Sequence, residues 1–281
     1  MLKMALITSL NNNAVQPANQ VTINALPLEV LGVIFGYLSP EQLAKACRVS
    51  KLWNAVASQE HLWNVFDLKT LFPKLSILDS QVWNDHIDLN AFGLSFADAE
   101  PLNKRKVILE LKRLFAVLKV EGDAGITLLT IPKGLSFNKL VKLAGCPIKG
   151  NKAAFKYIWD RITAELGDVV VQKTYRVAIT NNILVGSRDK SSYVQQLLVK
   201  KFGCDKPKMI DAVALAILSF ISSTAQLPLR LLSANPLTCT RCLEMIGNFP
   251  LAVGSFAPGG LHVYDSYFDH EYFGVLGCWK L

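Results

Sequence analysis

The sequence predicts an α+β protein, with a small three-helix unit over residues 23–66 and a mixed helix and sheet domain toward the C-terminus. Two observations predict this class. In residues 23–66, apolar residues recur three or four positions apart in short segments, which is the period of a helix. From residue 101 onward, amphipathic segments alternate with β-branched runs, and short runs broken by Gly and Pro gather near the end.

Composition places the chain among globular proteins with reduced thiols. Of its 281 residues, 51% are hydrophobic and 19% are charged, which is typical of a chain that buries a core. Its six cysteines are scattered, which favours a reducing, cytoplasmic compartment. Residues 1–22 are rich in Asn and Gln and lack a small-residue cleavage site, so we expect a disordered lead-in without a secretory signal.

The formal net charge of +8 is concentrated in the middle of the chain. Residues 101–120 hold six basic residues against one acidic residue, Glu110. Such a segment suits an anionic partner or membrane surface, although lysines at helical spacing more often form a solvent-exposed face. The cations are not interleaved with aromatic residues at a spacing that would stack on bases, so we expect no nucleic acid partner.

One uncharged stretch raises the question of a membrane span. Residues 212–229 carry no charge over 18 positions, which is near the lower limit for a transmembrane helix. The stretch also contains Ser, Thr, Gln and Pro. We therefore expect a buried helix and no transmembrane segment.

The helices of the N-terminal unit are predicted from their caps and stripes. The first begins near Pro27, whose fixed φ suits the first turn of a helix. Ser39 and Gln42 form a capping box around Pro40, and Ser50 caps a third helix. Leu62 and Trp63 close the unit. The inward stripes are Leu31, Ile34, Phe35 and Leu38, then Leu43, Ala44 and Cys47, then Trp53, Val56 and Ala57.

This unit carries more apolar surface than it can enclose. Some forty residues in three helices cannot offset a conformational entropy cost of about 1–2 kcal/mol per ordered residue. The unit must therefore pack on its own chain or on a partner. A surplus of apolar surface of this kind predicts an interaction face. The residues that supply the surplus are Leu26, Pro27, Ile34, Phe35 and Leu38.

The same residues resemble an F-box. That family shows Leu-Pro-x-Glu-Ile-Leu, then Ile-Phe, then Leu-x-Pro-x-Asp-Leu, then Val-Cys-Lys-x-Trp, and finally Leu-Trp. The departures here are Gln42 in place of the acidic residue and Ser50 in place of Cys. The matching anchors, in the same order, are Leu26-Pro27-Leu28-Glu29-Val30-Leu31, Ile34-Phe35, Leu38, Pro40, Leu43, Arg48-Val49-Ser50-Lys51-Leu52-Trp53 and Leu62-Trp63.

The resemblance implies docking onto a Skp-type adaptor of a cullin–RING (SCF) ubiquitin ligase. It implies a non-catalytic role, in which residues 101–281 form a substrate-binding domain that holds an unknown protein near the ligase. Within the docking set, Leu43 and Trp53 are expected to lie more internally, and the residues expected to face the adaptor are Leu26, Pro27, Ile34, Phe35 and Leu38. The set consists of Leu26, Pro27, Leu31, Ile34, Phe35, Leu38, Leu43 and Trp53.

The remaining elements are predicted from periodicity. Residues 67–100 are expected to form a helical connector that packs on the C-terminal domain, because no Gly/Ser linker separates the two. The amphipathic pattern of residues 101–119 predicts a long helix. The others are a buried strand over 125–132, helices over 136–145 and 151–167, a strand or strand pair over 168–182, helices over 191–203 and 207–223, and short strands over 249–279.

The C-terminal region has a resemblance of its own. Residues 125–144, 155–162, 174–184 and 250–263 are similar to the C-terminal region of F-box proteins encoded by chlamydia-related bacteria that live inside amoebae. That resemblance implies a bacterial effector acting in the cytosol of a eukaryotic host. It implies no chemistry for the region.

Two kinds of site chemistry are weighed against the adaptor interpretation. Cys239 and Cys242 have the spacing of a zinc knuckle, but the chain has no matching second pair after them, so we expect no metal and no cofactor. The alternative function is a thiol hydrolase tethered to host ligases by the F-box. It would combine Cys204, Cys239 or Cys278 with His262 or His270.

Overall fold

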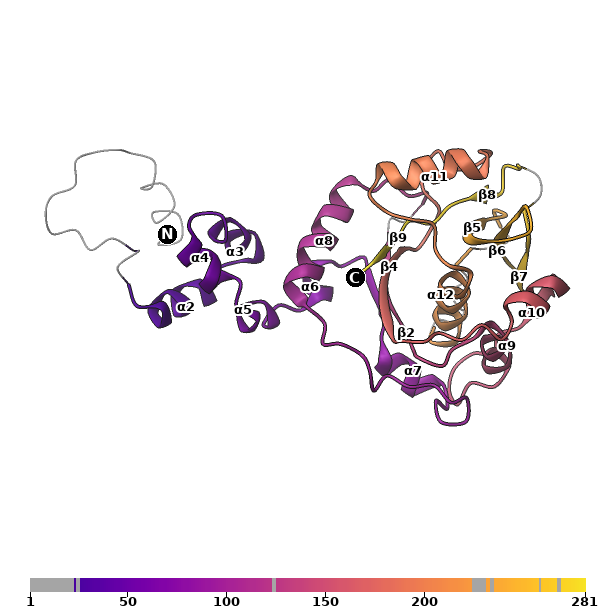
Figure 1. The fold of residues 1–281 in the computed structure, drawn as a ribbon, viewed down its shortest axis with the longest axis horizontal. Coiled ribbons are helices and arrows are strands. Elements are labelled where there is room, and N and C mark those ends of the chain that lie inside the picture. The colour runs from indigo at the N-terminus through magenta and orange to yellow at the C-terminus, as the bar shows by residue number, and fades with distance from the viewer. Residues whose placement is uncertain are drawn as a thin grey trace, which may run out of the picture. The chain divides into compact units, whose positions relative to one another are not determined.

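The computed structural model describes residues 23, 26–122, 125–223, 231–232, 235–257, 259–266 and 269–281. The chain divides into two units, Met1–Val65 and Phe66–Leu281 (Figure 1). The disordered lead-in expected for residues 1–22 lies outside the described residues.

The described part of the first unit consists of short helices joined by tight turns. The sequence predicts three, and the structure adds a fourth, because Leu62 and Trp63 belong to a short helix of their own. The helices are α2 (Leu28–Gly36), α3 (Pro40–Ala46), α4 (Lys51–Ala57) and α5 (Glu60–Asn64).

The predicted caps of these helices are confirmed. Ser39 Oγ accepts a hydrogen bond from the backbone N–H of Gln42, and Gln42 Oε1 accepts one from the backbone N–H of Ser39. Ser50 Oγ accepts from the backbone N–H of Trp53 at 3.1 Å. Pro27 is the N-cap of α2, one position before the first helical turn. The side chains of Ser39 and Ser50 each satisfy an amide that the helix leaves without a partner, whereas Pro27 makes no side-chain cap hydrogen bond.

The second unit is built on two sheets, and the predicted α+β class is confirmed. The first sheet has the order β1–β2–β4–β9, with β1 parallel to β2 and the other pairs antiparallel. Its strands are β1 (Leu75–Leu78), β2 (Ile126–Ile131), β4 (Tyr175–Thr180) and β9 (Cys278–Lys280).

The second sheet has the order β3–β7–β6–β5–β8. The β5–β6 and β6–β7 pairs are antiparallel, whereas β3 and β8 join the two edges in parallel. Its strands are β3 (Phe155–Ile158), β5 (Cys239–Ile246), β6 (Phe249–Ala257), β7 (Gly260–Asp265) and β8 (Phe273–Gly274).

Helix α12 (Met209–Ile221) forms the centre of the second unit, where it contacts strands of both sheets (Figure 1). Its apolar residues join those of β2, β5 and β6 in one core cluster. Among the described residues, no helix is long and apolar enough to cross a membrane. The other helices are α6 (Leu68–Leu71), α7 (Ser80–His86), α8 (Lys104–Val117), α9 (Phe137–Gly145), α10 (Asp160–Leu166) and α11 (Ser192–Lys201).

The segment expected to be a helical connector contains a strand. Besides α6 and α7, residues 67–100 hold β1, which pairs in register with β2, Leu75 opposite Ile126. A four-residue strand has too short a pattern to be recognised locally. Its partner lies about fifty residues further along the chain, and only the folded sheet brings the two together.

The segment expected to be one helix over residues 151–167 contains a strand followed by a shorter helix. Residues Phe155–Ile158 form β3 beside β7, and α10 begins only at Asp160, after Trp159 as N-cap. The aromatic and β-branched residues of this segment also suit a strand, and pairing with β7 decides in favour of one. Gly167 ends α10 as expected. Only Tyr175–Thr180 of the predicted extended run is a strand, and residues 224–229 of the predicted buried helix lie outside the described residues.

Asp211 lies in the first turn of α12 and is 2% exposed. Its Oδ1 accepts a hydrogen bond from Tyr175 Oη at 2.6 Å, and its Oδ2 accepts one from the backbone N–H of Lys208 at 3.2 Å. Burial raises the pKa of Asp211 to about 6, although these hydrogen bonds oppose the rise. Burial also raises the pKa of the neighbouring Glu244.

We expect this carboxyl group to make the protein less stable as the pH rises. Between about pH 4, the usual pKa of an unfolded Asp, and about pH 6, the folded state holds the Asp211 proton that the unfolded state has released. Stability therefore falls with pH in this window. Urea unfolding of Asp211→Asn at several pH values should show a shallower fall, with a remainder due to Glu244. The exposed Asp160→Asn serves as control, and an unchanged slope in Asp211→Asn would contradict the assignment.

Candidate functional site

The first unit has a closed core that accounts for much of its apolar sequence. Leu31 and Leu43 are fully buried, and Trp53 is 8% exposed. The Phe35 ring packs edge-on against that of Trp53 at a centroid distance of 5.1 Å. Trp63 is also fully buried, and its Nε1 donates a hydrogen bond to the carbonyl of Ala57 at 2.7 Å.

Helix α2 nevertheless exposes apolar side chains. Leu28 and Val30 are about half exposed, Val33 is 63% exposed, and Tyr37 directly after the helix is 75% exposed. In a helix of nine residues this is a large share of the surface. Exposed apolar side chains gathered on one short helix are typical of an interaction site.

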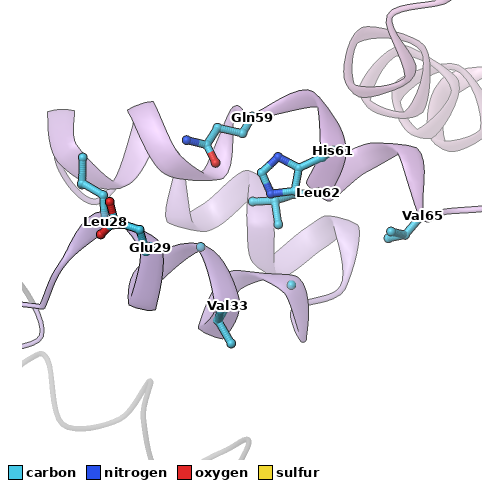
Figure 2. Close-up of a pocket in the computed structure, with 9 residues that line it drawn as sticks. Leu28, Glu29, Val33, Gln59, His61, Leu62 and Val65 are labelled. Carbon is cyan, nitrogen blue, oxygen red and sulfur yellow. The ribbon is translucent and has the colours of Figure 1, made fainter.

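A groove of about 560 Å³ lies between α2 and the segment around α5, and we call it the α2–α5 groove (Figure 2). Exposed apolar side chains border it, including Val33 and Val65, while Glu29, Gln59 and His61 add polar groups. It is lined by Leu28, Glu29, Gly32, Val33 and Gly36 from α2, and by Gln59, His61, Leu62 and Val65.

Two glycines four positions apart leave this groove open. A Cβ atom at Gly32 would meet no other atom within 4 Å, and one at Gly36 would meet only Leu62, at 3.9 Å. Packing within the unit therefore does not require glycine at either position. Glycine inside a helix costs about 0.5–1 kcal/mol relative to alanine. The residues keep a stretch of helix backbone accessible to a close-packing partner.

The structure divides the predicted docking residues into two groups. Pro27 is exposed, and Leu26, Ile34 and Leu38 are half-buried, so these four are accessible. Leu31, Phe35, Leu43 and Trp53 form the core. The expectation that Phe35 faces outward is therefore wrong for the unit as it stands, because its ring fills the space beside Trp53.

The sequence alone does not predict the α2–α5 groove. Ile34 lies about 200° around α2 from Gly32, because successive helical residues are about 100° apart. Ile34, which belongs to the predicted docking set, and Gly32, which lines the groove, therefore lie on different sides of α2. The sequence feature that could indicate the groove is the pair of glycines, Gly32 and Gly36, at helical spacing within a helix that is otherwise largely apolar.

Comparison with known families bears on this unit. Residues 23–69 match the F-box-like family model. F-box domains are non-catalytic adaptor modules of SCF ubiquitin ligases, where they bind a Skp-type subunit, so the match indicates an adaptor role in general terms. It covers about a sixth of the chain. No curated protein and no solved structure matches the chain.

The candidate zinc ligands lie on one strand. Cys239 and Cys242 belong to β5, where residues three positions apart point to opposite faces. Cys239 packs with Ala252 and Phe273 in a small cluster, and Cys242 belongs to the main core. The two thiols therefore do not face a common ion.

The candidate nucleophiles are buried thiols. Burial raises the pKa of Cys204 to about 12 and that of Cys239 to about 11, and it raises the pKa of Cys278 well above its usual value. The thiolate is the reactive form, so burial works against nucleophilic chemistry at all three. Cys239 Sγ lies 3.2 Å from Tyr264 Oη.

The two candidate histidines lie among aromatic rings. The His262 ring packs near Tyr157 and Tyr264, at centroid distances of 6.4 and 6.2 Å. Burial, followed by the charge of Lys156, lowers the pKa of His262. The His270 ring lies 4.1 Å from that of Tyr272.

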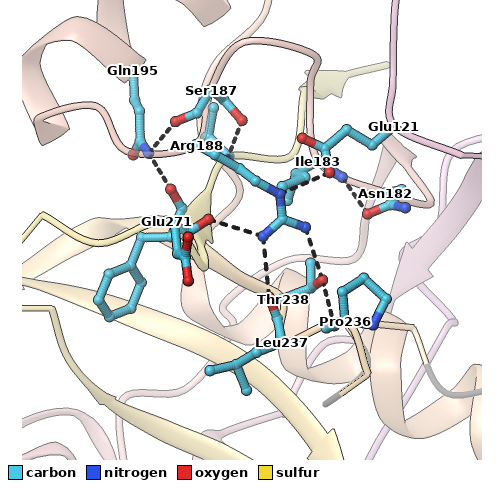
Figure 3. A network of polar contacts seen from close by, with 12 residues as sticks. Glu121, Asn182, Ile183, Ser187, Arg188, Gln195, Pro236, Leu237, Thr238 and Glu271 are labelled. Carbon is cyan, nitrogen blue, oxygen red and sulfur yellow. Dashed lines mark hydrogen bonds and ion pairs between the residues drawn. The ribbon is translucent and has the colours of Figure 1, made fainter.

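A polar network around Arg188 links separate segments of the second unit (Figure 3). Arg188 Nε donates to Glu121 Oε2 at 2.8 Å, and Nη2 donates to Thr238 Oγ1 at 3.0 Å. Nη1 donates to the carbonyls of Leu237 and Glu271 at 3.1 and 3.0 Å. All three guanidinium nitrogens are engaged within the protein, so this arginine joins separate segments of the second unit.

Thiol burial predicts which cysteine reacts first with an alkylating reagent. Cys146 is exposed, whereas Cys204, Cys239, Cys242 and Cys278 are buried. Near neutral pH, we expect Cys146 to be labelled first and the four buried thiols only when the protein unfolds. Mass spectrometry of peptides over time checks this, with Cys146→Ser removing the fast phase. Rapid labelling of Cys239 in the folded protein would count against the assignment and in favour of an activated thiol.

Proposed function

We propose that the first unit docks a Skp-type adaptor of a cullin–RING ubiquitin ligase, and that the second unit binds a protein that is to be ubiquitinated. The observation that carries the proposal is the coincidence of two features in one unit. Residues 23–69 match the F-box-like model, and α2 within them exposes apolar side chains although the core of the unit is filled.

The docking surface is assigned from accessibility. We assign direct contact to Leu26, Pro27, Ile34 and Leu38, which partner atoms can reach. Removing apolar area from water contributes about 25 cal/mol per Å², so a partner that covers this face gains binding free energy. The buried members of the predicted set, Leu31, Phe35, Leu43 and Trp53, act by holding α2 in place.

The α2–α5 groove extends this surface to a second side of α2. Its open backbone at Gly32 suits close approach by a partner helix or loop, and Val33 and Val65 offer apolar contact on either side. Glu29 and His61 border the groove and can select the partner by hydrogen bonding. A partner that contacts both sides of α2 would cover the apolar residues of this helix that remain exposed outside the core.

The mechanism of such a receptor is proximity. The chain performs no bond chemistry. It raises the effective concentration of the bound protein beside a charged ubiquitin-conjugating enzyme. The raised pKa values of the buried thiols do not favour the alternative of a thiol hydrolase in the second unit.

We further propose that the protein is a bacterial effector that works in the cytoplasm of a eukaryotic host. The support is the resemblance of residues 125–144, 155–162, 174–184 and 250–263 to the C-terminal region of F-box proteins from bacteria that live inside amoebae. A Skp-type partner is available only in a eukaryotic cell, so the docking surface would have its function there.

Substitution at the start of α2 tests the docking proposal. The double variant Leu26→Ala, Pro27→Ala should weaken binding to a purified Skp-type adaptor by roughly ten- to a hundredfold, because a few buried apolar anchors supply most of the energy of an interface. Titration calorimetry gives the Kd. The matched control is Ile148→Ala, Leu197→Ala, which removes exposed apolar side chains from the second unit. Absence of binding by the native protein, or equal binding by both variants, would show the proposal to be wrong.

Substitution of Gly32 separates docking from folding. Gly32→Ala adds a Cβ where no atom lies within 4 Å, so it should stabilise the free protein by about 0.5–1 kcal/mol through helix propensity. The same methyl group stands in the α2–α5 groove and should weaken adaptor binding. Urea unfolding and the adaptor titration should therefore move in opposite directions. Unchanged affinity would remove the groove from the docking surface.

A further inference from the structure

A second cavity, of about 410 Å³, lies in the second unit, and we call it the cationic cavity. It is formed by residues 99–103, the first turn of α8, the start of β4 and the end of β9. Pro101, Leu102 and Val107 give it an apolar wall. Its charged lining comes mainly from basic side chains, namely Lys106, Lys173, Arg176 and Lys280.

Acidic groups in this cavity are too few to neutralise the cations. Glu100 is the one acidic side chain in its lining, and it is paired with Lys173 Nζ at 2.7 Å. The pKa of Glu100 is lowered, first by the hydrogen bond and charge of Lys173 and also by the charge of Arg176. Four basic side chains therefore face one acidic side chain in this lining.

Besides Arg176, it is Lys106 and Lys280 that carry the charge that Glu100 does not balance. Both also line a neighbouring cavity of about 330 Å³, which contains Glu110 and Asp205. Those two carboxylates are engaged elsewhere, Glu110 with Arg113 and Asp205 with Lys200. Within the part of the chain that the structure describes, neither ammonium group has a side-chain partner.

The first turn of α8 adds to the positive field. The backbone N–H groups at a helix N-terminus carry a partial positive charge, and acidic residues are favoured there. In α8 the N-cap Asn103 is followed by Lys104, Arg105 and Lys106, and the first turn contains no acidic residue. The cations of the cavity and the helix dipole therefore reinforce each other, and an anion between them would relieve the repulsion.

We propose that the cationic cavity binds the phosphate group of a small, soluble organic phosphate. A phosphate monoester carries close to two negative charges and three acceptor oxygens, which suit the ammonium groups of Lys106 and Lys280, the two lysines of the cavity without a side-chain partner among the described residues. The planar guanidinium of Arg176 can donate to two oxygens of a phosphate group, although Nη1 also donates to the carbonyl of Glu100 at 2.5 Å. The volume suits a small ligand, and the apolar wall suits its organic part. This site lies outside the adaptor-docking surface and does not depend on it.

Phenyl phosphate is a suitable probe because it joins a phosphate monoester to an apolar body. The native full-length chain should bind it saturably by titration calorimetry at low salt, about tenfold or more tighter than benzoate, which has the same ring and a single charge. The double variant Lys106→Gln, Lys280→Gln should lose about tenfold in affinity. The matched control, Lys142→Gln, Lys201→Gln, removes the same charge from exposed lysines outside the cavity and should retain binding.

A third variant moves the affinity in the other direction. Glu100→Gln removes the acidic side chain from the lining and releases Lys173, so it should tighten phenyl phosphate binding by roughly threefold. A gain of affinity cannot arise from loss of folding. Equal losses in the two lysine double variants, equal affinity for benzoate, or weaker binding by Glu100→Gln would each overturn the proposal.

Sedimentation with vesicles distinguishes a soluble ligand from a lipid headgroup. Phosphatidic acid presents the same monoester on a membrane surface. Binding to vesicles of phosphatidylcholine with phosphatidic acid, combined with no binding of phenyl phosphate, would overturn the assignment to a soluble ligand. Binding of phenyl phosphate without retention on these vesicles supports it.

Discussion

Helix α12 crosses the second unit between its two sheets, and twelve of its thirteen residues are buried. Strands from distant parts of the chain pack against it, including β1 from the start of the unit and β5 and β6 from its end. A helix that is apolar on all sides has no favourable place at a protein surface. Its burial therefore requires both sheets, and it explains why the C-terminal strands belong to the same unit as residues 66–100.

This arrangement also decides where polar groups can lie. Asp211 is drawn into the interior with the first turn of α12, where Tyr175 from β4 and the backbone of Lys208 supply its hydrogen bonds. The first sheet ends at β9, beside β4, and the basic residues of β4, β9 and α8 meet at that edge. Lys106, Arg176 and Lys280, which are far apart in the sequence, come together there.

The first unit meets a different constraint. Its helices contain nine residues or fewer, so few side chains are available to form a core. Leu31, Phe35 and Trp53 are used for that purpose, and the apolar residues that remain on α2 face water. Helix α2 therefore supplies side chains both to the core of the unit and to the proposed docking surface. The two glycines on its outer face weaken the helix slightly and leave room for a partner.

The sequence by itself determined the features that rest on neighbouring residues. The capping box at Ser39, the cap at Ser50, the amphipathic helix α8 and the buried strand β2 all depend on interactions within a few positions, and the F-box pattern could be recognised for the same reason. Tertiary structure decided the rest. Strands β1 and β3 exist because partners far along the chain complete their hydrogen bonds. The inward turn of Phe35, the α2–α5 groove and the gathering of Lys106, Arg176 and Lys280 depend on how helices and strands pack, which local periodicity does not encode.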